Sequence, residues 1–167
     1  AELGPGRGTL MADMLRAAAV KPAFLAAADI HLVEISPRLR QVQRATLAGS
    51  GAALHWHARM ADVPDGPAIV IANEFFDALP IRQFEWRGGK WCERMIGLAD
   101  DGSLAVGLRP VDQRAADVPL PDGAIVEAGA LRDAAAAEIG ARLARSGGAA
   151  LIIAYGQIGR ASGRDRG

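Results

Sequence analysis

Three closely spaced glycines stand near the start of the chain, in the segment Glu2-Leu3-Gly4-Pro5-Gly6-Arg7-Gly8. Glycine permits tight turns and lets a ligand approach the backbone closely. A dinucleotide-binding loop has the spacing Gly-x-Gly-x-x-Gly, but here the third glycine comes one residue early, at Gly8. The carboxylate of Glu2 suits a cationic ligand and would repel a pyrophosphate. The alternative is a glycine-rich turn into a helix that holds no ligand.

Glu34 is a second candidate, because it ends the short apolar run 30–34. This run follows the glycine segment and one helical crossover. In nucleoside-binding α/β folds, an acidic residue at this place accepts hydrogen bonds from ribose hydroxyls. A solvated glutamate at a strand end is the structural alternative, and the position of Glu34 favours the functional interpretation.

The third candidate is the segment Asn73-Glu74-Phe75-Phe76-Asp77-Ala78-Leu79-Pro80, which follows the apolar run 68–72. The amide of Asn73 can donate to or accept from a substrate amine. Glu74 and Asp77 can hold a cationic substrate or take its proton. Alternatively, the segment is a helix N-terminus with Asn73 as its cap and the acids favouring the helix dipole. Both interpretations can hold together.

The elements that position these residues alternate between strand and helix. We expect strands at 30–34, 53–57, 68–72 and 149–155, and a helix before or after each. Thr9 is the expected N-cap of the first helix, and Ser36 caps a helix that begins at Pro37. The pattern predicts an α/β fold with a parallel sheet covered by helices on both faces. Ligands bind such sheets at the carboxyl ends of the strands, where the candidates lie.

An antiparallel meander is expected within this pattern. Strand-like runs at 81–86, 91–98 and 103–108 are separated by segments with hairpin-turn residues. Trp86 and Trp91 should pair across the first hairpin. A polar loop follows at 110–123, and an alanine-rich helix is expected at 128–145.

Several polar residues receive a structural interpretation. His55 and His57 share one side of a strand without a third ligand in view, so we predict no metal site. In the helix after Pro37, the expected apolar side consists of Leu39, Val42 and Ala45. The expected solvated side of that helix consists of Arg38, Arg40 and Arg44.

Composition excludes several classes of function. The chain has 19 Lys and Arg against 19 Asp and Glu, so no net basic field attracts nucleic acid or an anionic membrane. The single cysteine, Cys92, excludes an internal disulfide and a cysteine-built zinc site. The chain has no apolar run of about 20 residues, the length needed to span a bilayer. We therefore expect neither nucleic-acid nor membrane partners.

Four sequence blocks resemble one known family: ELGPGRGTLMADMLR, VEISPRLRQVQ, IANEFFDALPIRQF and WCER are similar to the MidA family of methyltransferases. The resemblance implies a Rossmann-like class I methyltransferase sheet with the meander inserted, S-adenosyl-L-methionine as cofactor, and protein arginine as acceptor. The MidA family includes an arginine methyltransferase that serves in complex I assembly. By position, Glu2, Gly4, Gly6, Gly8 and Glu34 are implied to bind the cofactor. Asn73, Glu74 and Asp77 are implied to line the acceptor side.

The resemblance implies a protein substrate and a location in the cytoplasm of a bacterium or the mitochondrial matrix of a eukaryote. A non-catalytic assembly factor that keeps the fold to bind a partner is the alternative function, and a nucleotide-dependent oxidoreductase is a further one. Only Ala1 to Leu3 precede Gly4 and remain to form the strand before it, so we expect a fragment cut at both ends. We expect residues 1–156 to form the methyltransferase core, and residues 157–167 to be a disordered or non-native tail.

Overall fold

The structure, a computed structural model, describes residues 1–112, 115 and 120–155. The chain divides into two compact units. The first unit consists of residues 1–78 and the chain from Ala136 onwards, and the second consists of Leu79–Ala135. Part of the predicted polar loop (113–114 and 116–119) and the predicted tail (157–167) lie outside the described residues.

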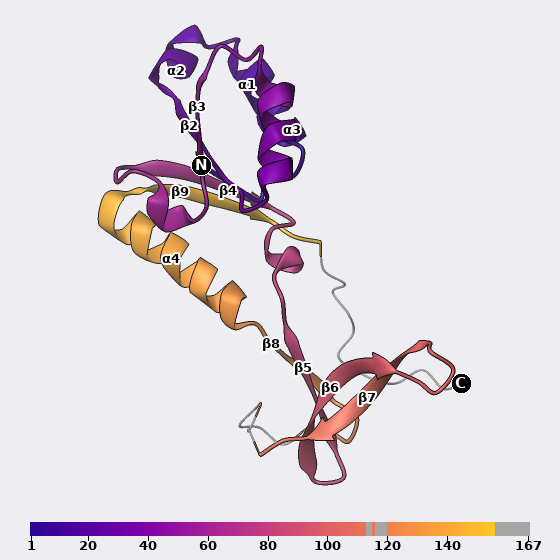
Figure 1. Cartoon of the computed structure of the whole chain (residues 1–167). Coiled ribbons are helices and arrows are strands. Elements are labelled where there is room, and N and C mark those ends of the chain that lie inside the picture. The colour runs from indigo at the N-terminus through magenta and orange to yellow at the C-terminus, as the bar shows by residue number, and fades with distance from the viewer. Residues whose placement is uncertain (113–114, 116–119, 156–167) are drawn as a thin grey trace, which may run out of the picture. The chain divides into compact units, whose positions relative to one another are not determined.

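A five-stranded sheet forms the centre of the first unit (Figure 1). Its strand order is β3-β2-β1-β4-β9, and all four pairings are parallel. The strands are β1 (Glu2–Leu3), β2 (Asp29–Val33), β3 (Ala53–His57), β4 (Ala68–Asn73) and β9 (Gly148–Ile153). Since β2 and β4 flank β1, the chain order reverses beside β1. This is the place where open α/β sheets bind ligands.

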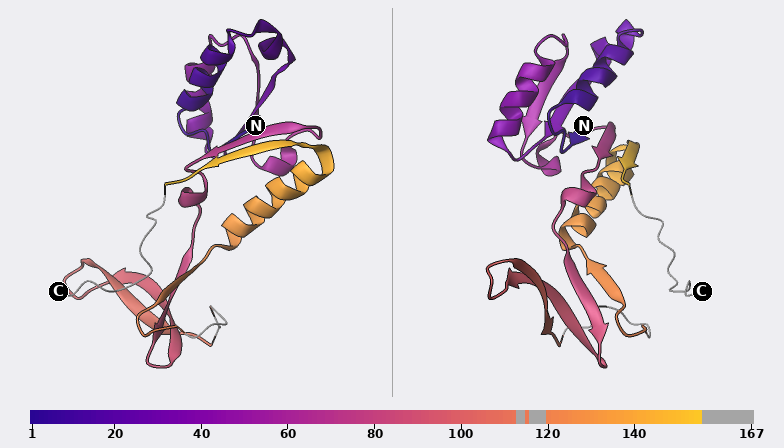
Figure 2. Two further views of the ribbon diagram at one scale, coloured as in Figure 1. Left: turned by 180° about the vertical axis from the view of Figure 1, so that it is seen from behind. Right: turned by 90° about the vertical axis from the view of Figure 1, so that its right-hand side faces the viewer.

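Helices cover both faces of this sheet, as the alternating pattern predicted (Figure 2). They are α1 (Thr9–Ala18), α2 (Pro22–Ala27), α3 (Pro37–Leu47) and α4 (Ala130–Ser146), with short 3₁₀ turns η1 (Met60–Asp62) and η2 (Phe76–Ala78). Successive strand residues point to opposite faces, so Leu32 packs with α1 and α3 while Val33 packs with Ile139 of α4. Each fully buried side chain of this size contributes about 1.5–3 kcal/mol.

The N-caps of α3 and α1 differ in their chemistry. Ser36 caps α3 as predicted, because its Oγ accepts a hydrogen bond from the backbone N–H of Leu39. The predicted cap at Thr9 is wrong. Gly8 occupies that position with φ of 80°, and Thr9 is already helical. The Gly8 N–H donates back to the Pro5 carbonyl in a sharp turn, which requires a left-handed residue that glycine provides without strain.

The second unit is the predicted antiparallel meander with one additional strand. Its order is β7-β6-β5-β8, formed by β5 (Arg82–Arg87), β6 (Lys90–Leu98), β7 (Leu104–Pro110) and β8 (Ile125–Ala128). Trp86 and Trp91 pair across the first hairpin with ring centroids 5.2 Å apart, as predicted. The sequence interpretation missed β8. Its four residues pair with β5, so α4 begins at Ala130 rather than at the predicted Ala128.

A buried carboxylate ties three strands of this unit together. Glu93 on β6 accepts hydrogen bonds from Arg82 on β5 and from Arg109 on β7. These two guanidinium groups lower the pKa of Glu93 to about 2, and Arg82 has the larger effect. The WCER block therefore has a structural role in the meander. In the described part of the chain, no helix is long and apolar enough to cross a membrane.

Candidate cofactor and acceptor site

The glycine segment forms a loop between β1 and α1 with an unusual backbone. Gly4, Gly6 and Gly8 have φ values of 59°, 55° and 80°, which other residues adopt only with strain. The Gly4 N–H donates to the carbonyl of Val33 at the end of β2, at 3.0 Å. A Cβ added to Gly6 would meet no atom within 4 Å, so this part of the loop faces open space. The free N–H groups of the first turn of α1 follow directly.

Glu2 lies on β1, two residues before Gly4, and is buried. The residue is 2% exposed, and within the described part of the chain its Oε2 atom is buried without a hydrogen-bond partner. Burial raises the pKa of Glu2 to about 7. An unpartnered buried carboxyl is costly, and a cationic group nearby would restore its charged form.

Glu34 directly follows β2 and is also buried. Its Oε1 accepts a hydrogen bond from the Ser36 N–H at 2.8 Å, and its Oε2 accepts one from Gln43 Nε2 at 3.3 Å. Its backbone N–H donates to the carbonyl of His57 at the end of β3. The carboxylate therefore has a fixed orientation at the carboxyl edge of the sheet.

Gln43 on α3 is a site residue that the sequence analysis missed. It is completely buried and also donates to the Gly6 carbonyl at 2.8 Å, while its Oε1 accepts from Trp56 Nε1 at 2.9 Å. The predicted apolar side of α3 is therefore partly wrong: Ala45 is exposed, whereas Gln43 and Leu47 are buried. The four-residue spacing from Leu39 to Gln43 to Leu47 was the available signal.

The predicted solvated side of α3 is confirmed at Arg38 and Arg44, which are exposed, and is wrong at Arg40, which is half-buried. Arg40 Nε donates to the backbone carbonyl of Glu34 at 2.6 Å. The guanidinium of Arg44 lies 4.1 Å from the ring centroid of Trp56, in a cation–π contact. Both arginines therefore support the strand ends around Glu34 rather than facing only solvent.

The predicted acceptor segment begins at Asn73, which is the last residue of β4. Glu74 has φ of 52°, and among the described residues it alone combines a side chain with a left-handed backbone. Its N–H donates to the Ile153 carbonyl, and its Oε1 accepts from the Tyr155 N–H at 3.1 Å. Only the three-residue turn η2 follows, rather than the α-helix considered as the alternative. Backbone strain of this kind persists where the surrounding structure enforces it, often at functional sites.

The acceptor segment packs against the glycine loop through one aromatic ring. A Cβ placed on Gly4 would lie 2.9 Å from Cδ2 of Phe75. Phe75 in turn contacts Phe76 edge to face, with ring centroids 5.5 Å apart. The structure thus brings the first and third candidate segments together. Asn73 and Asp77 are exposed, and within the described chain neither side chain has a hydrogen-bond partner.

A row of histidines lies elsewhere on the sheet. His31 on β2 joins the two predicted histidines of β3, with its Nδ1 2.9 Å from Nε2 of His57. His55 Nε2 lies 2.8 Å from a carboxylate oxygen of Asp29. Burial lowers the pKa of His31 and of His57. Across the described ranges, no group of three or more His, Cys, Asp or Glu side chains is arranged to hold a metal ion.

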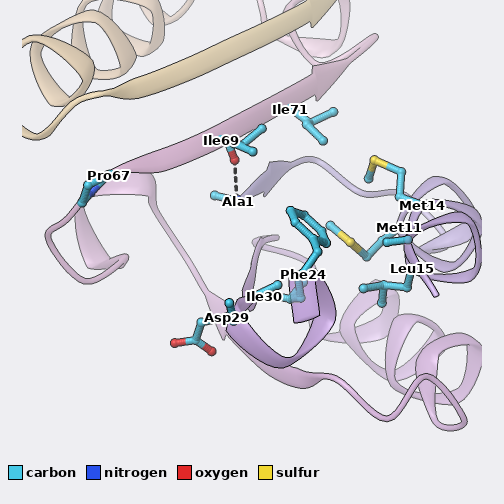
Figure 3. Close-up of a pocket in the computed structure, with 13 residues that line it drawn as sticks. Ala1, Met11, Met14, Leu15, Phe24, Asp29, Ile30, Pro67, Ile69 and Ile71 are labelled. Atoms are coloured by element: carbon cyan, nitrogen blue, oxygen red, sulfur yellow. Dashed lines mark hydrogen bonds between the residues drawn. The ribbon is translucent and has the colours of Figure 1, made fainter. Parts of the chain in front are cut away.

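An apolar cavity of about 300 Å³ opens at the other end of the strands (Figure 3). It lies beside the amino-terminal ends of β2 and β4, where these strands extend past the two-residue β1. Met11, Leu15 and Phe24 line it, and the only acidic residue in its wall is Asp29. The glycine loop is at the carboxyl edge, so this cavity is separate from the candidate site.

The profile of the family described as "Putative S-adenosyl-L-methionine-dependent methyltransferase" matches residues 1–167. The chain belongs to this family. Membership confirms the predicted resemblance and S-adenosyl-L-methionine as the cofactor on which the methyltransferase family depends.

Named relatives of this chain are longer proteins. Protein arginine methyltransferase NDUFAF7, mitochondrial, of Danio rerio is 34% identical over 202 residues, covering 99% of this chain and 46% of the relative. The protein of the same name from Homo sapiens is 33% identical over 197 residues, with 99% and 44% covered. The chain thus spans less than half the length of these curated relatives.

A crystal structure supports the fold. A COG1565 superfamily member from Burkholderia thailandensis, bound to S-adenosyl-homocysteine, superimposes with a TM-score of 0.68 and 27% identity, over 84% of this chain and 38% of that chain. This similarity confirms the predicted α/β methyltransferase fold class. The roles of the individual residues stay predictions that rest on their geometry.

Proposed function

We propose that this protein transfers a methyl group from S-adenosyl-L-methionine to a guanidinium nitrogen of arginine in a partner protein. The observation that carries the proposal is the loop of three left-handed glycines beside the two buried carboxylates of Glu2 and Glu34. The named relatives, which are protein arginine methyltransferases, support the choice of acceptor.

The residues around the loop fit this cofactor. The open side of Gly6 leaves room for a ligand against the backbone, and the unpartnered Oε2 of Glu2 favours a cationic group nearby. Glu34 keeps lone pairs on both oxygens that can accept ribose hydroxyls. When bound, S-adenosyl-L-methionine supplies an electrophilic methyl group. Glu2 and Glu34 bind and orient, and they do not react.

The acceptor side would consist of Asn73, Glu74 and Asp77. A guanidinium group pairs bidentately with a carboxylate, which accounts for two acids in one short segment. Oε1 of Glu74 is held by the Tyr155 N–H, so its second oxygen is available to the acceptor. A carboxylate here can orient the nitrogen and take the proton that it releases. Phe75, packed on Gly4, sets the position of this segment against the loop.

The first test is calorimetric titration of the full chain with S-adenosyl-homocysteine. We expect saturable binding that is lost in Gly6→Val and strongly weakened in Glu34→Ala. Gly51→Val is the matched control for Gly6→Val, because Gly51 has φ of 69° and also no atoms near its virtual Cβ. Gly51 precedes β3 at the other edge of the sheet, so this variant carries a similar backbone cost and should retain binding.

The second test supplies labelled S-adenosyl-L-methionine with peptides that contain either arginine or lysine. Transfer to arginine alone, lost in Glu74→Gln and Asp77→Asn, is the expected result. Transfer to lysine would contradict the acceptor. Absence of binding in a folded parent protein would contradict the cofactor and favour a non-catalytic factor that uses the fold to bind a partner.

A further inference from the structure

We infer that Gln43 is a positioning residue that fixes the Glu34 carboxylate and the Gly6 carbonyl together, and so determines how strongly the site discriminates in favour of a ribose ligand. The inference rests on the proposed function, since it concerns the same cofactor site. It assigns a role to a residue that has no place in the glycine segment and no charge.

The Gln43 amide joins three elements that are distant in sequence. Its Nε2 donates to the Gly6 carbonyl at 2.8 Å and to Glu34 Oε2 at 3.3 Å. Its Oε1 accepts from Trp56 Nε1 at 2.9 Å. Two of the partners are acceptors and the third is a donor, so only one orientation of the amide satisfies all of them. The loop, the end of β2 and β3 are thereby held in one register.

Burial makes this arrangement stringent. Gln43 is 0% exposed, and a buried amide group without partners is strongly unfavourable. The glycine loop also rests on the Gln43 stem, because a Cβ on Gly8 would lie 3.4 Å from its Cγ and 3.5 Å from its Cα. An apolar residue at this position would leave the Gly6 carbonyl and the Trp56 N–H without these partners. The polar contacts therefore account for a glutamine at this position.

The consequence falls on the ribose contact. Oε1 of Glu34 is held by the Ser36 N–H and Oε2 by Gln43, so the carboxylate plane is fixed from both sides. Each oxygen retains one lone pair for a ligand hydroxyl. Without Gln43, one oxygen loses its partner and the carboxylate can rotate about its terminal torsion, which has a broad preference.

The experiment compares two ligands on the full chain by calorimetry: S-adenosyl-homocysteine and its 2′-deoxy analogue. In the parent protein we expect the deoxy analogue to bind on the order of tenfold to a hundredfold more weakly, the value of a hydrogen bond to a charged group. In Gln43→Met, which has nearly the same volume, we expect both ligands to bind more weakly and their affinity ratio to fall to about two or less.

Two further variants complete the design. Gln43→Glu keeps the shape and the acceptor for Trp56 but loses both donors, so its ratio should fall as in Gln43→Met. Gln41→Met makes the same change at an exposed glutamine of the same helix and should keep the parent ratio. Circular dichroism and thermal unfolding select the variants that fold, and either Gln43 variant is sufficient to decide.

The outcomes separate the two claims. A folded Gln43 variant that weakens both ligands by the same factor, so that the ratio is unchanged, would overturn the inference and leave the proposed function intact. A folded parent protein that binds neither ligand would overturn the proposed function, and the inference with it.

Discussion

Gly4→Ala should damage the protein in two separable ways. The first cost is conformational, because φ at Gly4 is 59° and an L-residue in this region costs about 1–2 kcal/mol. The second cost is steric, because the new Cβ would lie 2.9 Å from Cδ2 of Phe75. Forcing a methyl group into a packed contact costs typically about 1–3 kcal/mol. We expect the free energy of unfolding to fall by about 2–5 kcal/mol in total.

Gly6→Ala isolates the conformational cost. Gly6 has nearly the same φ, 55°, but its virtual Cβ meets nothing within 4 Å. This variant should lose only about 1–2 kcal/mol. The difference between the two variants, about 1–3 kcal/mol, is then the steric contribution of the aromatic ring.

A double-mutant cycle with Phe75→Ala measures that contribution directly. Removing the ring should abolish the steric part of the Gly4→Ala cost. The double variant should therefore be about 1–3 kcal/mol more stable than the sum of the two single losses predicts. Urea denaturation of the full chain, followed by fluorescence and circular dichroism, provides the free energies. Equal losses in Gly4→Ala and Gly6→Ala, with no coupling to Phe75→Ala, would show that the loop and the acceptor segment are not in contact.

Further variants test the remaining carboxylates. Burial raises the pKa of Glu2 to about 7 from 4.5, so between these pH values the folded state holds a proton that the unfolded state has released. The free energy of unfolding should therefore fall by about 3 kcal/mol as the pH rises through this window. Glu2→Gln should remove this pH dependence when urea unfolding is compared at pH 5 and pH 8. Glu93 behaves in the opposite sense, because Arg82 and Arg109 lower its pKa to about 2 from 4.5. Its stabilising effect is present above pH 4.5 and is lost as the pH falls towards 2. Glu93→Gln should therefore reduce the dependence of the unfolding temperature on pH in this acid range. Glu74→Ala and Glu74→Gly both lose the contact with the Tyr155 N–H, and we expect methyl transfer to an arginine peptide to be lost in both. Only glycine relieves the left-handed backbone, so Glu74→Gly should be more stable than Glu74→Ala by about 1 kcal/mol in urea unfolding; equal stabilities would contradict the assigned strain.

Local patterns predicted the elements of this fold well. Apolar runs identified the parallel strands, Ser36-Pro37 identified the start of α3, and the glycine turns identified the hairpins. These signals lie within a few consecutive residues. The strand β8 was missed because its four residues precede an alanine-rich helix, and its pairing with β5 is a contact between distant segments.

The site was predicted only in part, for a similar reason. Gly4, Glu34 and Glu74 stand at strand ends, and topology alone brings strand ends together. Gln43 lies inside a helix, where a glutamine normally faces solvent. Its role depends on three partners that approach from separate parts of the chain, and no local pattern reports such a convergence.

The pairing of β5 with β8 has a consequence for how this protein can change over evolutionary time. Arg82 lies near the start of the second unit (Leu79–Ala135) and Ala128 lies near its end, and these two residues are register partners. The two ends of the meander therefore lie side by side. Such a segment can be lengthened, shortened or exchanged without separating the strands it interrupts. Selection can thus remodel the meander while the glycine loop and its buried glutamine stay under their own constraints.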